Sequence, residues 1–169
     1  MGKISKKINK TPYQQARENL GLSREEASRL TGLEPSKIER IENEKLNKID
    51  PYDVVLMQEA YKEPLLFNYY CTNECPIGIK YVAPISLYDF KEITLETLAS
   101  INALQKRRDR IVEIARDGIV DSSELEDFVS IQNELEQISM AVEALQMWCE
   151  KMIAEGKINK LQYERIKGK

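Results

Sequence analysis

Two cysteines separated by three residues are the first side chains in this sequence whose spacing suggests chemistry. Cys71 and Cys75 stand in the segment Tyr-Tyr-Cys-Thr-Asn-Glu-Cys-Pro-Ile-Gly, and two thiolates so placed can begin a zinc site or form a redox disulfide. A structural zinc site takes four ligands, and Cys149 is the only other cysteine of the chain. A metal site, a redox disulfide and packed thiols all stay open, and the sequence favours packed thiols.

A second segment has the spacing of the back half of a calcium-binding loop. Gly118 and Glu124 are six residues apart, as in an EF-hand loop, but Ala115 would occupy an early ligand position and has no oxygen to offer. We therefore expect no metal there. The segment is better interpreted as a turn between two helices, in which Gly118 ends one helix and Asp121 or Ser122 caps the next.

The sequence of 169 residues contains no histidine. This excludes imidazole base catalysis, Ser-His and Cys-His nucleophile pairs and most catalytic zinc sites. We expect a protein that is not an enzyme and that needs no cofactor.

Composition places the chain among globular proteins. It is 42% hydrophobic and 31% charged, and no run approaches the roughly 18 apolar residues that a transmembrane helix needs. The first ten residues are basic (Lys3, Lys6, Lys7 and Lys10) but lead into no apolar run, so we expect no signal peptide. Few cysteines and no secretion signal favour the cytoplasm.

Proline divides the chain into two parts. The last of the six prolines is Pro84, and only three glycines interrupt the sequence after it. Because proline and glycine end helices, the first part should hold short helices and the second part long ones.

Five short helices are predicted in the first part, each from a capping residue or a proline. Thr11 caps the first, with Pro12 at its first position, while Ser23 and Glu26 form a capping box at the second. Gly32 suits the left-handed position that follows the second helix. The predicted ranges are 12–20, 24–31, 35–43, 51–61 and 64–70.

Two long helices are predicted in the second part, over 87–116 and 123–154. Apolar residues of the latter alternate by three and four positions, which indicates a heptad seam. The seam residues assigned to dimerisation are Leu135, Ile138, Val142, Leu145, Cys149 and Met152. Two helices alone leave apolar faces uncovered, so we expect packing on the first part or pairing of two copies in a four-helix bundle. The basic tail after residue 156 is expected to fray.

Residues 22–45 hold a recognisable motif. Leu-Ser-Arg-Glu-Glu opens the predicted second helix, Gly32 lies in the turn, Pro-Ser-Lys-Ile opens the third helix and Arg-Ile-Glu-Asn closes it. With these motifs, residues of about 11–70 resemble the helix-turn-helix family of Cro and lambda-type repressors, often called XRE. The resemblance implies a five-helix DNA-binding domain whose third helix enters the major groove.

The resemblance also implies roles for individual residues. The start of the third helix would contact base edges, and residues flanking the motif would contact phosphates. The implied base contacts are Glu34, Ser36, Lys37 and Arg40, and the implied phosphate contacts are Arg24, Asn43 and Lys45. These roles agree with general chemistry, because an arginine can donate two hydrogen bonds to guanine and a helix N-terminus favours phosphate binding.

The charges of residues 34–45 differ from the pattern usual in this family. Residues 34–45 contain four acidic and three basic side chains, and Glu44 replaces the usual glycine. A glutamate can accept a hydrogen bond from cytosine but repels phosphate. A domain that has lost DNA binding and now binds protein therefore stays open, and the lysines of residues 1–10 are either a DNA-binding arm or a solvated tail.

Arg17 and Glu42 match positions at which many members of this family place a buried ion pair. Because burying either charge alone is costly, we expect the two side chains to be paired. Glu42 would then not face DNA.

We predict an all-α protein in which a five-helix helix-turn-helix domain precedes a long antiparallel helical hairpin. The predicted parts are a basic arm (1–10), the helix-turn-helix domain (11–72), a connector containing Cys75 (73–86), the hairpin (87–155) and a basic tail (156–169). The predicted function is a bacterial-type, sequence-specific transcriptional regulator that dimerises through the hairpin and binds an inverted repeat in double-stranded DNA. The alternative is a protein-interaction adaptor, in which the hairpin engages a protein partner and the helix-turn-helix domain no longer binds DNA.

Overall fold

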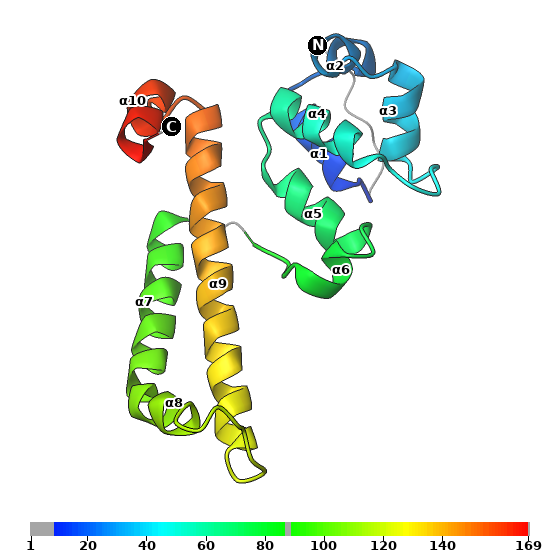
Figure 1. Ribbon diagram of the computed structural model, residues 1–169. Helices are drawn as coiled ribbons and strands as arrows, with labels where there is room; N and C mark the ends of the chain where they lie inside the picture. The colour runs from blue at the N-terminus through cyan, green and yellow to red at the C-terminus, as the bar shows by residue number, and fades with distance from the viewer. Residues whose placement is uncertain (1–8, 87–88, 169) are drawn as a thin grey trace. The chain divides into compact units, whose positions relative to one another are not determined.

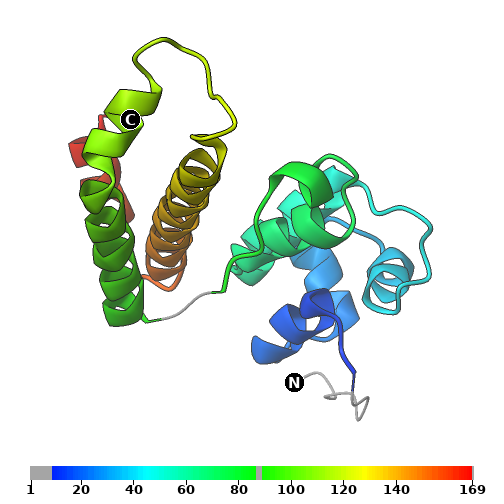
Figure 2. The same cartoon turned by 90° about the horizontal axis from the view of Figure 1, so that it is seen from below.

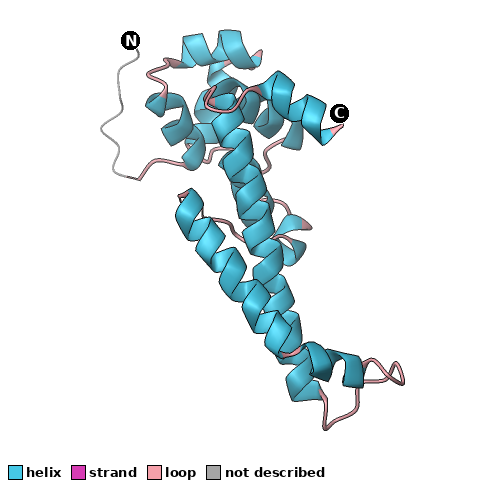
Figure 3. Cartoon of the chain, turned by 90° about the vertical axis from the view of Figure 1, so that its left-hand side faces the viewer, coloured by secondary structure: helices cyan, strands magenta, loops and turns pink. Residues whose placement is uncertain are grey.

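The computed structural model describes residues 9–86 and 89–168. These residues form ten α-helices and no β-strand, so the described part is all-helical, as predicted (Figure 3). None of these helices is long and apolar enough to cross a lipid bilayer. The chain divides into two compact units. Unit 1 comprises residues up to Pro84 together with those from Cys149 onward, and unit 2 comprises Ile85–Trp148.

Unit 1 opens with three short helices: α1 (Pro12–Asn19), α2 (Arg24–Thr31) and α3 (Pro35–Glu42). The hydroxyl of Thr11 accepts a hydrogen bond from the backbone N–H of Gln14, and Ser23 forms the capping box at α2. Gly32 has a φ of 75°, a left-handed conformation that favours glycine and ends α2. All three helices lie within one residue of their predicted ranges.

Two further helices complete the predicted set, α4 (Pro51–Tyr61) and α5 (Leu65–Asn73). The short helix α6 (Gly78–Tyr81) was not predicted, and it packs closely on α5. A Cβ atom at Gly78 would lie 2.2 Å from the carbonyl oxygen of Cys71. Only glycine therefore allows this approach of the two segments.

The first five helices pack together (Figure 1, Figure 2), and their buried apolar side chains form one core. Helix α2 packs on α3 and α4, and α1 packs on α3, α4 and α5. The buried apolar residues of this core are Tyr13, Ala16, Ala27, Leu33, Ile38, Ile41, Ile49, Val54, Met57, Tyr61, Leu66 and Tyr70. Cys71 and Cys75 lie half-buried against it as free thiols.

The C-terminal tail contains a helix that the sequence did not suggest. Helix α10 (Lys160–Lys167) begins where Asn159 accepts a hydrogen bond from the backbone N–H of Gln162, and it ends at Gly168. A local cap and a terminal glycine thus give helical structure where fraying was expected.

Unit 2 contains α7 (Phe90–Lys106) and α8 (Arg108–Ile114), followed by α9 (Leu125–Ala154), which continues into the residues of unit 1. The prediction of one helix over 87–116 is wrong, because the chain leaves the helical conformation at Arg107 (φ −102°, ψ 4°), and residues 87 and 88 lie outside the described part. Before α9, the carboxylate of Asp121 accepts hydrogen bonds from the backbone N–H groups of Ser123 and Glu124.

Helices α7 and α9 lie side by side in unit 2 (Figure 1, Figure 2). The rings of Phe90 and Trp148 lie against each other with their centroids 4.8 Å apart and their planes tilted by 32°. Further along, the Arg107 guanidinium lies 2.7 Å from Glu134, and ion pairing also joins Arg110 to Asp127. The buried apolar residues of unit 2 are Ile93, Ile114, Ile131, Ala141 and Ala144.

The predicted seam residues differ in burial. Leu135, Val142 and Leu145 are exposed, while Ile138, Cys149 and Met152 are half-buried. The most buried positions of α9 are instead Ile131, Ala141 and Ala144. The predicted seam residues therefore lie beside the residues through which α9 packs against the rest of this chain.

Candidate nucleic-acid interface

Helix α3 has a buried side and an exposed side of different chemistry. Ile38 and Ile41 are completely buried in the core. Because an α-helix turns once in 3.6 residues, Ser36, Arg40 and Asn43 lie on the opposite side in one line. Ser36 and Arg40 are exposed, and Asn43 is half-buried at the end of the helix. We call these three residues the outer line of α3.

The acidic residues of this segment do not stand on the outer line. Glu42 is 0% exposed, and Glu44 lines a separate hollow described below. Glu34 and Glu39 are exposed beside the outer line, and Glu34 makes no side-chain capping hydrogen bond at the start of α3. The one charged side chain of the outer line is therefore the arginine, Arg40.

Glu42 is paired inside the core. Its carboxylate accepts hydrogen bonds from Nε and Nη2 of Arg17, the latter at 3.0 Å, and Arg17 is itself buried. Burial opposes the charge of Arg17, but the hydrogen bond and charge of Glu42 raise the pKa of its guanidinium above the ordinary value. Burial and the charge of Glu42 also raise the pKa of Tyr61.

Arg24 contacts the same carboxylate. Its Nε lies 2.9 Å from Oε2 of Glu42, while its side chain stays 32% exposed at the start of α2. Glu42 therefore joins α3 to both α1 and α2. The resemblance that assigned phosphate contact to Arg24 gave no sign of this link, because it depends on the folded position of two distant segments.

Lys37 has a partner within the chain as well. Its Nζ lies 2.7 Å from Oδ1 of Asp53, a buried residue in the first turn of α4. Sequence reasoning placed Lys37 among base-contacting residues and did not single out Asp53. No local pattern could have identified the pair, since its members come from different helices.

The chain turns sharply after α3. Glu44 has a φ of 54°, a left-handed conformation that suits the glycine usual in the resembled family. The N–H of Lys45 donates to the carbonyl of Arg40 at 2.8 Å, and the side-chain amide of Asn43 donates to the carbonyl of Glu39. This turn leaves the Lys45 side chain exposed just beyond the outer line.

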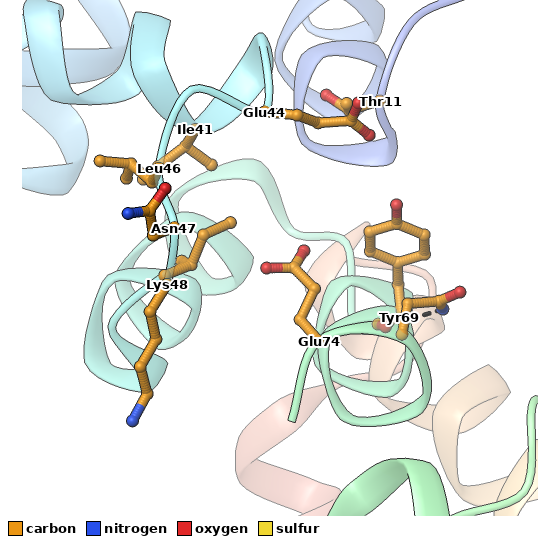
Figure 4. A pocket seen from close by; sticks show the side chains of 10 residues that line it. Thr11, Ile41, Glu44, Leu46, Asn47, Lys48, Tyr69 and Glu74 are labelled. Atoms are coloured by element: carbon orange, nitrogen blue, oxygen red, sulfur yellow. Dashed lines mark hydrogen bonds between the residues drawn. The ribbon is translucent and has the colours of Figure 1, made fainter. Parts of the chain in front are cut away.

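A hollow of about 400 Å³ lies between the turn after α3 and the end of α5 (Figure 4). Its lining includes Glu44, Lys48, Tyr69 and Glu74, and the carboxylate of Glu74 points into it while the Lys48 amine points away (Figure 4). The hydroxyl of Tyr13 donates to Glu74 at 2.9 Å. Burial raises the pKa of Glu74 and Glu44 adds to the effect, although the hydrogen bond from Tyr13 opposes it.

Part of the chain matches a known protein family. Residues 14–57, less than half of the chain, match the family model described as a helix-turn-helix domain. This segment contains α2, α3 and the turn between them. No curated protein and no solved structure matches the chain. The helix-turn-helix domain indicates a DNA-binding regulator.

Proposed function

We propose that the protein is a sequence-specific transcriptional regulator of the XRE type found in bacteria, with α3 as its recognition helix. The observation that carries this proposal is the outer line of α3. It offers Ser36, Arg40 and Asn43 on the side opposite the core, while Glu42 is buried and Glu44 faces a different hollow. A helix of this kind can enter the major groove without placing a carboxylate at its centre.

The proposed roles follow from position. Arg40 can donate two hydrogen bonds to one guanine, and Ser36 lies one turn nearer the start of the helix. Glu34 and Lys37 stand beside them, although Lys37 must leave Asp53 before it can contact a base. Asn43, Lys45 and Arg24 are the proposed phosphate contacts.

Selection of genomic DNA fragments by the purified full chain, followed by sequencing, tests this function. We expect one enriched motif, and the Arg40→Ala protein provides the matched control that should lose it or relax it at one position. Random fragments are a poor substitute, since the remaining glutamates beside α3 weaken contact with phosphate in general. A folded protein that enriches no motif would contradict the proposal and favour the adaptor.

We further propose that α7 and α9 form an antiparallel hairpin that dimerises. The antiparallel direction is supported by the order of contacts: Phe90, Arg107 and Arg110 rise along the chain while their partners Trp148, Glu134 and Asp127 descend. Two copies related by a two-fold axis would present two recognition helices to an inverted repeat.

One side of this hairpin carries exposed apolar side chains from both helices. Each of these residues directly follows, in sequence, a more buried residue of the same helix. An α-helix is right-handed, so each step along the chain rotates the side-chain direction by about 100° in the same sense. On two antiparallel helices that pack together, this rotation away from the buried positions points to the same side of the pair. The four residues concerned are Leu98, Ile101, Leu135 and Val142, which we call the hairpin face.

The hairpin face is the proposed dimer surface. Leu98 is 53% exposed, and Leu135 and Val142 are 44% and 42% exposed, which leaves substantial apolar area in water. On α9, Glu136 directly follows Leu135 and Glu143 directly follows Val142, while α7 carries Lys106. A two-fold axis parallel to the helices would set α9 of one copy against α7 of the other, so that unlike charges meet at the rim.

A further inference from the structure

The carboxylate of Glu42 is shared between two arginines of different exposure. Nη2 of Arg17 donates to its Oε2 at 3.0 Å from within the core, and Nε of Arg24 donates to the same oxygen at 2.9 Å from the surface. Glu42 is completely buried. Arg17 also lies 3.7 Å from a second carboxylate, that of Glu18, whereas Glu42 is the one carboxylate that pairs with Arg24 among the described residues. The positive charge that Glu42 does not balance therefore belongs to the more exposed Arg24.

The guanidinium of Arg24 is held by only one edge. Its Nε bonds Glu42, whereas Nη1 and Nη2 have no hydrogen-bond partner among the described residues. Two carboxylates stand in the first turn of α2. That of Glu26 accepts a hydrogen bond from the backbone N–H of Ser23 at 2.7 Å, and the exposed Glu25 forms no ion pair with Arg24. The free edge of Arg24 is thus fixed in direction and not neutralised by its own helix.

We infer that Glu42 is a positioning residue that orients Arg24 to bind a DNA phosphate, an inference that rests on the proposed function. An arginine can hold a carboxylate through Nε and still present two parallel donors to phosphate oxygens. Because the side chain is already held in place, binding orders fewer rotamers than it would for a free arginine. The pair that joins α1 to α3 therefore also prepares the surface of α2 for DNA.

This arrangement requires arginine rather than any cation at position 24. A lysine ammonium is a single point of charge, and the buried carboxylate of Glu42 would attract it away from a phosphate. Arg24→Lys should therefore lose most of the affinity that Arg24→Ala loses. If position 24 supplied only charge, lysine would replace arginine without loss.

The test measures affinity for the selected motif as a function of salt concentration, using the full chain. Arg24→Ala and Arg24→Lys should each lower affinity several-fold and reduce the slope of log affinity against log salt by about 0.9, the value of one phosphate contact. Arg29→Lys, at an exposed arginine of the same helix, is the matched control and should change neither quantity. Wild-type affinity and slope in Arg24→Lys would overturn the inference.

Glu42→Gln provides the second arm. If it folds, it should reduce the slope as Arg24→Ala does, and adding Arg24→Ala to it should cause little further loss. Fully additive losses would contradict positioning. If it does not fold, NMR of the wild-type Arg24 Nε–H gives the second readout: a slowly exchanging resonance supports the contact with Glu42, and a rapidly exchanging one contradicts it. A wild-type protein that binds no motif overturns the proposed function, whereas normal wild-type binding with a fully active Arg24→Lys overturns only this inference.

Discussion

The ammonium of Lys37 lies 2.7 Å from Oδ1 of Asp53, and this ion pair joins the proposed recognition helix to the first turn of α4. Asp53 is buried, and its other oxygen, Oδ2, has no hydrogen-bond partner among the described residues. A buried carboxylate with one partner depends strongly on that partner. Lys37 therefore has a structural role that any contact with DNA must compete against.

Replacing Lys37 should lower stability. Lys37→Ala leaves Asp53 buried and unpaired, and we expect the free energy of unfolding to fall by about 1–3 kcal/mol, measured by urea denaturation. Asp53→Asn provides the matched second variant, since the double substitution should cost clearly less than the sum of the two single ones. Additive effects would show that the two side chains do not interact.

The ion pair between α1 and α3 should contribute more. Arg17→Met removes the buried guanidinium that faces Glu42, and stability should fall by about 3–5 kcal/mol in thermal or urea unfolding. Arg29→Met, at an exposed arginine on α2, is the control and should change stability only slightly. An unchanged melting temperature in Arg17→Met would contradict a stabilising pair.

The hollow beside α5 predicts a pH effect. The pKa of Glu74 is raised in the folded protein, so the folded state binds this proton more tightly than the unfolded chain does. The stabilising effect of this proton is complete below the pKa that Glu74 has in the unfolded chain, and it is lost as pH rises through the pKa that Glu74 has in the folded protein. Glu74→Gln should therefore stabilise the protein near pH 7, by less than about 1 kcal/mol, and should have almost no effect near pH 4. Urea titrations at both pH values measure this difference, with the exposed Glu59→Gln as the control. Destabilisation at neutral pH would show that the hydrogen bond from Tyr13 outweighs burial.

Introducing charged residues on the hairpin face should dissociate the proposed dimer into monomers. Leu135→Glu combined with Val142→Glu places two carboxylates in the proposed apolar contact, so light scattering of the full chain should change from twice the monomer mass to the monomer mass. Leu161→Glu tests an exposed leucine of α10, outside the hairpin, and should leave the dimer intact. A wild-type chain that is monomeric at micromolar concentration would refute dimerisation directly.

Local signals account for the part of the fold that the sequence predicted well. Thr11 with Pro12, and Ser23 with Glu26, cap their helices through bonds within a few residues, so the pattern is visible in the sequence itself. The same applies to Asp50 before α4. The first residues of α1, α2, α3 and α4 were predicted correctly for this reason.

Contacts between distant segments account for what was missed. The interruption at Arg107 coincides with its pairing to Glu134, twenty-seven positions away, and no local residue marks a break there. The link from Arg24 to Glu42 and that from Lys37 to Asp53 likewise depend on packing of separate helices. Residue type alone could identify Arg24 and Lys37 as cations near a motif, but only the structure gives their partners.

The outer line of α3 leads to the prediction that separates regulator from adaptor. Arg40 is exposed at its centre, and a guanine contact through two hydrogen bonds contributes about 1–3 kcal/mol of discrimination. Arg40→Ala should therefore weaken binding to the selected motif by that amount and relax the preference at one base pair.

Lys45→Ala is the matched variant at a proposed phosphate contact. It should weaken binding to all sequences alike and reduce the salt slope by about one unit, without altering the preferred motif. Titrations of both variants against the motif and against single-base variants of it, at several salt concentrations, measure these effects. Equal loss on every sequence in Arg40→Ala would assign this arginine to the DNA backbone, and α3 would then not supply specificity in the way that its outer line suggests.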